Sequence, residues 1–180
     1  MRDLVLTLIG PDRPGLVDAM AERVAAHGGN WLESRMAHLA GQFAGILRVE
    51  VPEDRVAELQ SSLAELESQG VRVVAQGGAT GESGAERTME LSLVGQDHPG
   101  IVRKVAQVLL RHGVNIEELT SDRTSAPMTG GRLFSAKARL NVPETAEAED
   151  LRRELERIAD DLMVELTLVQ AVIGHRPRRD

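Results

Sequence analysis

The sequence predicts an α+β protein in which one small βαββαβ domain occurs twice in tandem. Three observations support this prediction: an internal repeat, the same order of strand-like and helix-like periods in each copy, and a glycine-rich segment between the copies. Length alone is neutral, because 180 residues can form two small domains or one domain not far above the common size of about 100–150 residues. The repeat therefore determines the predicted architecture.

The repeat is a gapless match between residues 4–30 and residues 89–115. Identical pairs at an offset of 85 include Gly10 and Gly95, Asp12 and Asp97, Pro14 and Pro99, Gly15 and Gly100, Val17 and Val102, His27 and His112, Gly28 and Gly113, and Asn30 and Asn115. Phe43 and Pro52 recur as Phe134 and Pro143 at an offset of 91. The second copy thus carries six extra residues (91 − 85), which we place in the turn-rich segment 121–131.

The apolar period in the first copy changes from that of a strand to that of a helix and back. Alternation over residues 4–9 predicts a strand that ends at Gly10. Apolar residues then recur at helical spacing from Leu16 to Ala25, and the segment 27–29 ends this helix. Two strand-like runs, a second helix marked by Val56, Leu59, Leu63 and Leu66, and a final strand over residues 71–76 complete the copy.

The second copy repeats this order. Apolar residues at 101–109 and 151–162 have helical spacing, and residues 134–142 alternate as a strand with one buried and one solvated face. Two such split βαβ units give a ferredoxin-like fold, an antiparallel four-stranded sheet with both helices on one face. The predicted segments are a first domain at 1–76, a linker at 77–88, a second domain at 89–173 and a basic tail at 174–180.

Charge and composition narrow the possible functions. The net charge of −7 is opposite to the basic surface that binds a phosphate backbone, so we expect no direct binding to nucleic acid. The chain has no cysteine, and its apolar N-terminal run of about six residues is too short for a signal peptide or a membrane span. We expect a cytoplasmic protein without membrane association.

Residues that could support catalysis are scattered. The five histidines lack the spacing of a metal motif, and the serines lack a nucleophile elbow, so we expect no enzyme activity, no metal and no cofactor. The βαββαβ order also occurs in RNA-binding modules that stack bases on aromatic side chains. Each third strand here holds one aromatic residue, Phe43 or Phe134, without a basic-aromatic motif, which disfavours that class.

The turn between the first strand and the first helix of each copy is the most specific local signal. It reads GPDRPG at 10–15 and GQDHPG at 95–100. A proline near the helix start is preset for helical φ, and the following glycine lets a ligand approach the backbone. The N–H groups and the helix dipole there suit a carboxylate, and Asp12 or Asp97 suits an ammonium group. An α-amino acid carries both groups, and Asn30 or Asn115 could add a polar contact.

Two structural roles stay open for these residues. An Asp before a helix is often an N-cap, and an Asn after Gly is often only a turn residue. The candidate binding residues are Asp12, Arg13, Pro14, Gly15, Leu16 and Asn30 in the first copy and Asp97, His98, Pro99, Gly100, Ile101 and Asn115 in the second. Their recurrence at one spacing favours a shared role, in binding or in folding.

A βαββαβ unit with a D-R-P-G-L-V turn after its first strand resembles the ACT domain, an amino-acid-sensing module of metabolic regulators. Two such units with little else resemble the family of glycine cleavage system transcriptional repressors, and the likeness spans residues 4–172. The resemblance implies a small amino acid as ligand, with glycine or serine as candidates, and a protein partner, either a DNA-binding transcriptional regulator or a metabolic enzyme. It leaves open an effectorless interaction module or an enzyme's regulatory subunit.

The resemblance also suggests where ligand contacts lie. In serine-binding relatives they come from a His and an Asn in the turn and from an Asn at the second strand. Gly10 and Gly95 stand at the position of that His, Asp12 and Asp97 at that of the first Asn, and Asn30 and Asn115 match the second. These departures leave glycine or another small amino acid open as the ligand.

One face of each predicted sheet has no helix to cover it. In the first copy this face carries Val5, Ile9 and Ile46. A domain of about 75–85 residues buries little surface when alone, so we expect sheet-edge or face contacts between copies or between chains, and hence a homodimer.

Overall fold

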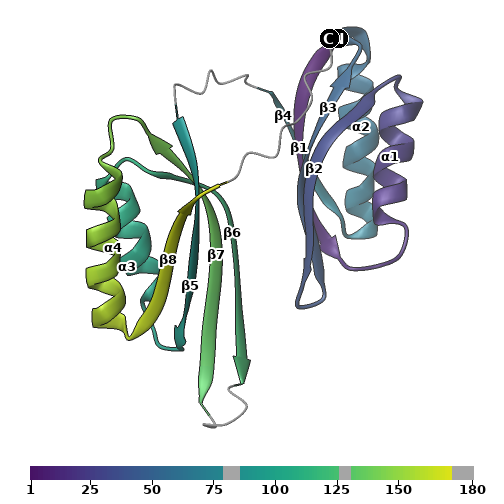
Figure 1. The fold of residues 1–180 in the computed structure, drawn as a ribbon. Coiled ribbons are helices and arrows are strands. Elements are labelled where there is room, and N and C mark those ends of the chain that lie inside the picture. Colours follow the sequence, from purple (N-terminus) through teal and green to yellow (C-terminus); the bar gives the residue numbers. More distant parts are fainter. Residues whose placement is uncertain (79–85, 126–130, 172–180) are drawn as a thin grey trace. The chain divides into compact units, whose positions relative to one another are not determined.

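A computed structural model describes residues 1–78, 86–125 and 131–171, and it confirms the predicted α+β class (Figure 1). The first unit contains β1 (Arg2–Pro11), α1 (Leu16–Ala26), β2 (Asn30–Leu39), β3 (Gln42–Val51), α2 (Val56–Ala64) and β4 (Arg72–Gly77), with 3-10 turns η1 (Glu53–Arg55) and η2 (Glu65–Gln69) on either side of α2. The second contains β5 (Glu86–Gln96), α3 (Ile101–Arg111), β6 (Asn115–Ser125), β7 (Arg132–Pro143), α4 (Ala148–Leu162) and β8 (Val164–Gln170).

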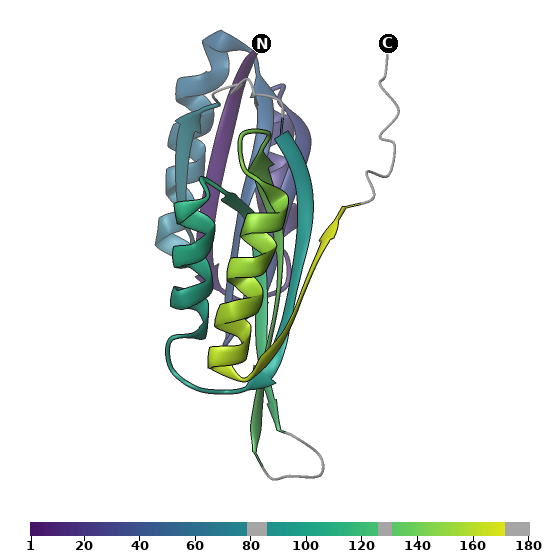
Figure 2. The ribbon, with the colours of Figure 1, turned by 60° about the vertical axis from the view of Figure 1, so that its left-hand side comes forward.

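Each unit is one antiparallel four-stranded sheet. The strand orders are β2-β3-β1-β4 and β6-β7-β5-β8, so the first strand of each copy is central. Figures 1 and 2 show α1 with α2, and α3 with α4, on one face of their own sheet. This is the ferredoxin-like arrangement that the repeat predicts.

The segments expected to be irregular are shorter than predicted. β4 runs to Gly77 and β5 begins at Glu86, so strands include both ends of the expected linker 77–88. Residues 121–125, expected in a turn, belong to β6, because the β6–β7 ladder continues to the pair Ser125 and Arg132. Residues 79–85, 126–130 and the expected tail at 174–180 lie outside the described residues.

The core of each unit lies between its sheet and its two helices. In the first unit Leu4, Leu6 and Leu8 of β1 are at most 1% exposed, while the residues between them are half-buried or exposed. They pack in one cluster with Met20 of α1 and Leu59 of α2. The alternation that predicts the strand is therefore the alternation between the core and the opposite face.

A charged group joins the two helices of the second unit. Glu154 of α4 accepts hydrogen bonds from His112 Nε2 (2.8 Å) and from Arg111, both at the end of α3. The bond from His112, followed by the bond from Arg111, lowers the pKa of the Glu154 carboxyl below its ordinary value of 4.5. The ionised carboxylate accepts these bonds more strongly than the neutral acid does, so its charge stabilises the folded domain.

We therefore expect Glu154→Gln to lower the melting temperature of the second unit near pH 7. A lowered folded-state pKa gives stability that is present above the unfolded-state value and is lost as pH falls through the folded-state value. The deficit of the variant should shrink over that acidic range, as measured by thermal unfolding from pH 7 to pH 2. Glu156→Gln, an exposed carboxylate on the same helix, is the control. An equal deficit at every pH would contradict this account.

Candidate functional site

The turn after the first strand is fixed to the nearby hairpin in both units. The Asp12 N–H donates to the Gly41 carbonyl (2.9 Å), and the Asp97 N–H donates to the Arg132 carbonyl (2.8 Å). Gly41 directly precedes β3, which pairs with β1, and Arg132 begins β7, which pairs with β5. β1 and β5 are the strands that lead into the two turns. The backbone of the turn is thus held by the sheet itself.

The helix after the turn starts at Leu16 or Ile101, where the helical spacing of the sequence also begins, and Pro14 and Pro99 precede it. The N-cap is the glycine, with φ of 89° at Gly15 and 97° at Gly100. This left-handed backbone is the reason for glycine, since no heavy atom of the described residues lies within 4 Å of a Cβ placed at either position. The surface above each cap is therefore open.

Neither turn Asp is an N-cap, because no side-chain hydrogen bond caps α1 or α3 in the described structure. The first helical hydrogen bonds run from Ala19 N–H to Gly15 O (2.9 Å) and from Lys104 N–H to Gly100 O (3.0 Å). The N–H groups of residues 16–18 and 101–103 precede this ladder and point toward the turn. They are the donors that an anion would meet at the helix end.

Each turn Asp faces a basic side chain that the sequence analysis did not single out. Asp12 Oδ2 lies 3.7 Å from His38 Nε2, and Asp97 Oδ2 lies 3.5 Å from Arg123 Nη1. His38 and Arg123 occupy the same position of the repeat, at the offset of 85, near the far ends of β2 and β6. Comparing the two copies of the repeat for residues of like charge, and not only for identical residues, identifies this pair.

The residue after each Asp holds the turn against the second helix. Arg13 Nη2 donates to Gln69 Oε1 (2.7 Å) at the end of η2, and His98 Nε2 lies 3.0 Å from the carbonyl oxygen of Leu162 at the end of α4. These contacts hold the turn against the rest of its unit. Asp12, Arg13 and Gly15 are exposed, whereas the first helical residues Leu16 and Ile101 are buried.

Gly10 and Gly95 have a packing reason to be glycine. A Cβ at Gly95 would lie 2.4 Å from Cγ1 and 2.8 Å from Cα of Val164, and one at Gly10 would lie 3.0 Å from the Gly70 carbonyl oxygen. The adjacent backbone at Val164 or Gly70 therefore occupies the space where the resemblance would place a His side chain. This backbone leaves no room for that side chain.

Asn30 and Asn115 are not brought to the turn of their own unit. Asn30 begins β2 and pairs with Glu50, which pairs with Asp3 at the start of β1. Asp12 lies beyond the other end of β1, about 25–30 Å away at about 3.3 Å per residue. Asn115 has the corresponding place in the second sheet, opposite Asn141. The expected single cluster of turn and Asn is therefore absent from each described unit.

Other kinds of site find little support in the described part of the chain. It contains no group of three His, Asp or Glu side chains placed to hold a metal ion. Among its helices, none is long and apolar enough to cross a membrane.

The fold and the turn define a class of protein: two ferredoxin-like domains in tandem, each with an open polar turn at the start of its first helix. Models of the ACT domain match residues 2–76 and residues 89–160. The chain belongs to the ACT domain family and consists chiefly of two ACT domains in tandem.

Relatives share this arrangement over most of the chain. The glycine cleavage system transcriptional repressor of Escherichia coli (strain K12) and that of Shigella flexneri are each 23% identical over 163 residues, or 88% of this chain and 85% of the relative. The crystal structure of an unknown protein from Galdieria sulphuraria matches with a TM-score of 0.81 and 28% identity, covering 95% of this chain and 99% of that one. A candidate glycine cleavage system transcriptional repressor matches in fold, with a TM-score of 0.69, 18% identity and coverage of 94% and 98%.

Proposed function

We propose that this chain is a cytoplasmic amino-acid-sensing regulator, similar to the glycine cleavage system transcriptional repressors, that acts through a protein partner and not through catalysis. The observation that carries the proposal is the pairing of a carboxylate and a basic group beside an open helix start, in both domains at equivalent positions. Net charge of −7 supports a partner that itself binds DNA, since the chain has no overall positive charge to attract a phosphate backbone.

The two charges of an α-amino acid match this arrangement. Its carboxylate would accept hydrogen bonds from the N–H groups of residues 101–103 and pair with Arg123, while its ammonium group would face Asp97. In the first domain the corresponding groups are residues 16–18, His38 and Asp12. In the second domain the ligand would insert between the preformed pair of Asp97 and Arg123, so it exchanges one ion pair for two.

The strand-start asparagines have a role in this proposal only through a second copy of the domain. Because Asn30 lies at the end of the sheet opposite to Asp12, it can complete a turn site only if the site belongs to another ACT copy packed in the reverse direction. β2 and β6 are edge strands of 10 and 11 residues, which offer unpaired backbone for such packing.

We also propose a homodimer formed by the uncovered sheet face of the first domain. Ile9, Ile46 and Val74 on this face are 49%, 50% and 47% exposed. At the positions equivalent to Val5, Ile9, Ala44, Ile46 and Val74, the second domain carries Glu90, Val94, Ser135, Lys137 and Thr167. The polar second face suits solvent, whereas the apolar first face suits another apolar surface, which a second copy of the chain supplies.

Charge also favours self-pairing of this face. Asp3, Glu33 and Arg48 cluster at the start of β1, with Arg48 Nη1 3.8 Å from Glu33 Oε1. Arg72 lies on the same face at the other end, opposite Ile9. A two-fold axis that reverses the strand direction would place the acidic end of one face against the arginine of the other.

An effectorless interaction module is the alternative that a specific observation favours. Arg13 and His98 already contact the ends of η2 and α4, and each turn Asp already faces a basic side chain. In that case the turns would only stabilise the domains, and the chain could serve as a partner-binding or enzyme-regulating subunit.

A thermal-shift titration of the full chain with glycine and serine distinguishes the two functions. A ligand at about 100 times its dissociation constant adds about 2.7 kcal/mol to the folded state. For a chain of this size each kcal/mol moves the melting temperature by about 2–4 °C, so we expect a rise of about 5–10 °C. Asp97→Asn and Asp12→Asn should each reduce the rise by removing the charge that faces the ammonium.

Asp54→Asn, which removes an exposed carboxylate at the far end of the first domain, is the matched control and should leave the rise unchanged. If no amino acid at millimolar concentration shifts the transition, the sensing proposal is wrong and the effectorless module replaces it. If the rise survives in the Asp12→Asn, Asp97→Asn double variant, the ligand binds elsewhere and the proposed site is wrong.

A further inference from the structure

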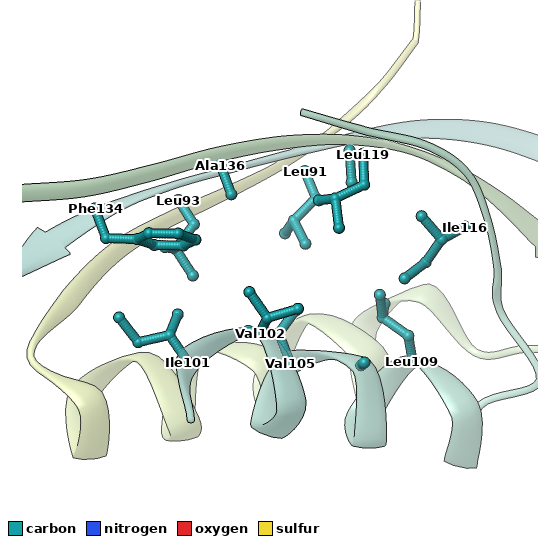
Figure 3. Close-up of a pocket in the computed structure, with 12 residues that line it drawn as sticks. Leu91, Leu93, Ile101, Val102, Val105, Leu109, Ile116, Leu119, Phe134 and Ala136 are labelled. Atoms are coloured by element: carbon teal, nitrogen blue, oxygen red, sulfur yellow. The ribbon is translucent and has the colours of Figure 1, made fainter. Parts of the chain in front are cut away.

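The second ACT domain contains an apolar cavity between α3 and its sheet. Its volume is about 40 Å³, and all twelve side chains that line it are apolar. Figure 3 shows Ile101 and Val102 of α3 facing Phe134 of β7 and Leu119 of β6 across this space. A water molecule inside would find no side-chain hydrogen-bond partner, so the cavity suits a hydrocarbon group.

The first domain fills the corresponding space with larger side chains. Met20, Trp31, Met36 and Leu47 pack in its core cluster, and Met20 and Leu47 are each 1% exposed. The equivalent residues of the second domain are Val105, Ile116, Ser121 and Ala138. All four exchanges remove volume. Three positions change in the opposite sense, because Leu109, Leu119 and Ala136 are larger than Val24, Ser34 and Gly45. These larger side chains do not fill the cavity.

The cavity lies beneath the first turn of α3, next to the candidate ligand turn. Ile101 and Val102 are the first two residues of α3, so the cavity begins beneath the N–H groups that would hold a carboxylate. Val102 and Leu119 are 45% and 47% exposed although both are apolar, and they mark its mouth between α3 and β6. A ligand held by its carboxylate at the helix start could therefore direct a side chain inward.

The size of the cavity indicates which side chain fits. One water-sized sphere needs about 10–15 Å³ of such space, so 40 Å³ admits about three to four non-hydrogen atoms. The side chain of valine has three and that of leucine has four. Glycine would leave the cavity empty.

We propose that the second ACT domain selects an amino acid with a branched aliphatic side chain, of valine or leucine size, whereas the first domain does not. This inference rests on the proposed amino-acid site and adds its specificity. Each buried methylene-sized group contributes about a fourfold gain in affinity, so partial filling by three carbons predicts a preference for valine over glycine of about tenfold or more.

The test is isothermal titration of the full chain with glycine, serine, valine and leucine. Ala138→Leu and Val105→Met each give the second domain the first domain's residue and fill the cavity. Both variants should abolish the preference for valine while keeping any response to glycine. Methyl NMR shifts of Val102 and Leu119 on valine addition give a readout that does not depend on either variant.

Each outcome decides the inference. A preference for valine that both filling variants remove, with shifts at Val102 and Leu119, supports it. Binding of glycine with valine less than threefold tighter overturns it and leaves amino-acid sensing intact. A preference that survives filling, or one without shifts at those methyl groups, also overturns it. If no amino acid binds, both this inference and the proposed function fail.

Discussion

Gly95→Ala is expected to destabilise the second ACT domain by about 1–3 kcal/mol, the usual cost of forcing extra volume into a packed site. The added Cβ would lie 2.4 Å from Val164 Cγ1 and 2.8 Å from Val164 Cα. Gly95 pairs directly with Val164 in the β5–β8 ladder, so relief requires a shift of backbone and not only of a side chain. Denaturant unfolding of the full chain should show the loss in the transition of the second domain.

Gly77→Ala is the matched control, because Gly77 is also in a strand but has no heavy atom of the described residues within 4 Å of the position that an added Cβ would take. It should change stability by less than about 0.5 kcal/mol. A harmless Gly95→Ala substitution would show that β8 can move away from the turn. The absence of a His at this position would then need another explanation than packing.

The fold was predictable because its signals are local and repeated. The alternation of Leu4, Leu6 and Leu8 reports directly on burial in β1, and the offset of 85 residues transfers each element to the second copy. Such periods depend on neighbours along the chain and need no knowledge of tertiary contacts. The helix cap was less predictable, because Gly15 takes a left-handed backbone at the N-cap, whereas the sequence left Asp12 open as a cap.

The candidate site was predictable only in part, because its remaining members come from distant segments. Asp97 lies in the recognised turn, but its cation, Arg123, is brought beside it by the β6–β7 hairpin and the register of β5. Asn30 shows the converse. It recurs with the turn in the sequence, yet ten residues of β1 separate their positions in the fold. Recurrence of Asn30 with the turn in both copies therefore does not mean that the two lie close together in the fold.

Dimerisation should be highly sensitive to Ile46→Lys. Ile46 is half exposed on the sheet face that carries Ile9 and Val74, between Thr7 of the central strand β1 and Arg35 of β2. The substitution introduces the residue that the second domain has at the equivalent position, Lys137, which the same fold tolerates there. Burying two symmetry-related ammonium groups in a self-pairing interface is costly, so we expect the dimer to weaken by at least about a hundredfold, or about 2.7 kcal/mol.

Sedimentation equilibrium of the full chain measures this directly, because wild type should have twice the chain mass of 19.5 kDa and the variant should have that mass itself. Val169→Lys is the control, since Val169 is 47% exposed in the second domain, where Val94 is the other exposed apolar residue of a mainly polar sheet face. It should leave the dimer intact. A monomeric wild type would contradict the proposed dimer, and a dimer that persists in Ile46→Lys would place the contact elsewhere. Because Ile46 is exposed in the isolated domain, its replacement should leave the unfolding transition of the monomer nearly unchanged, which separates lost association from misfolding.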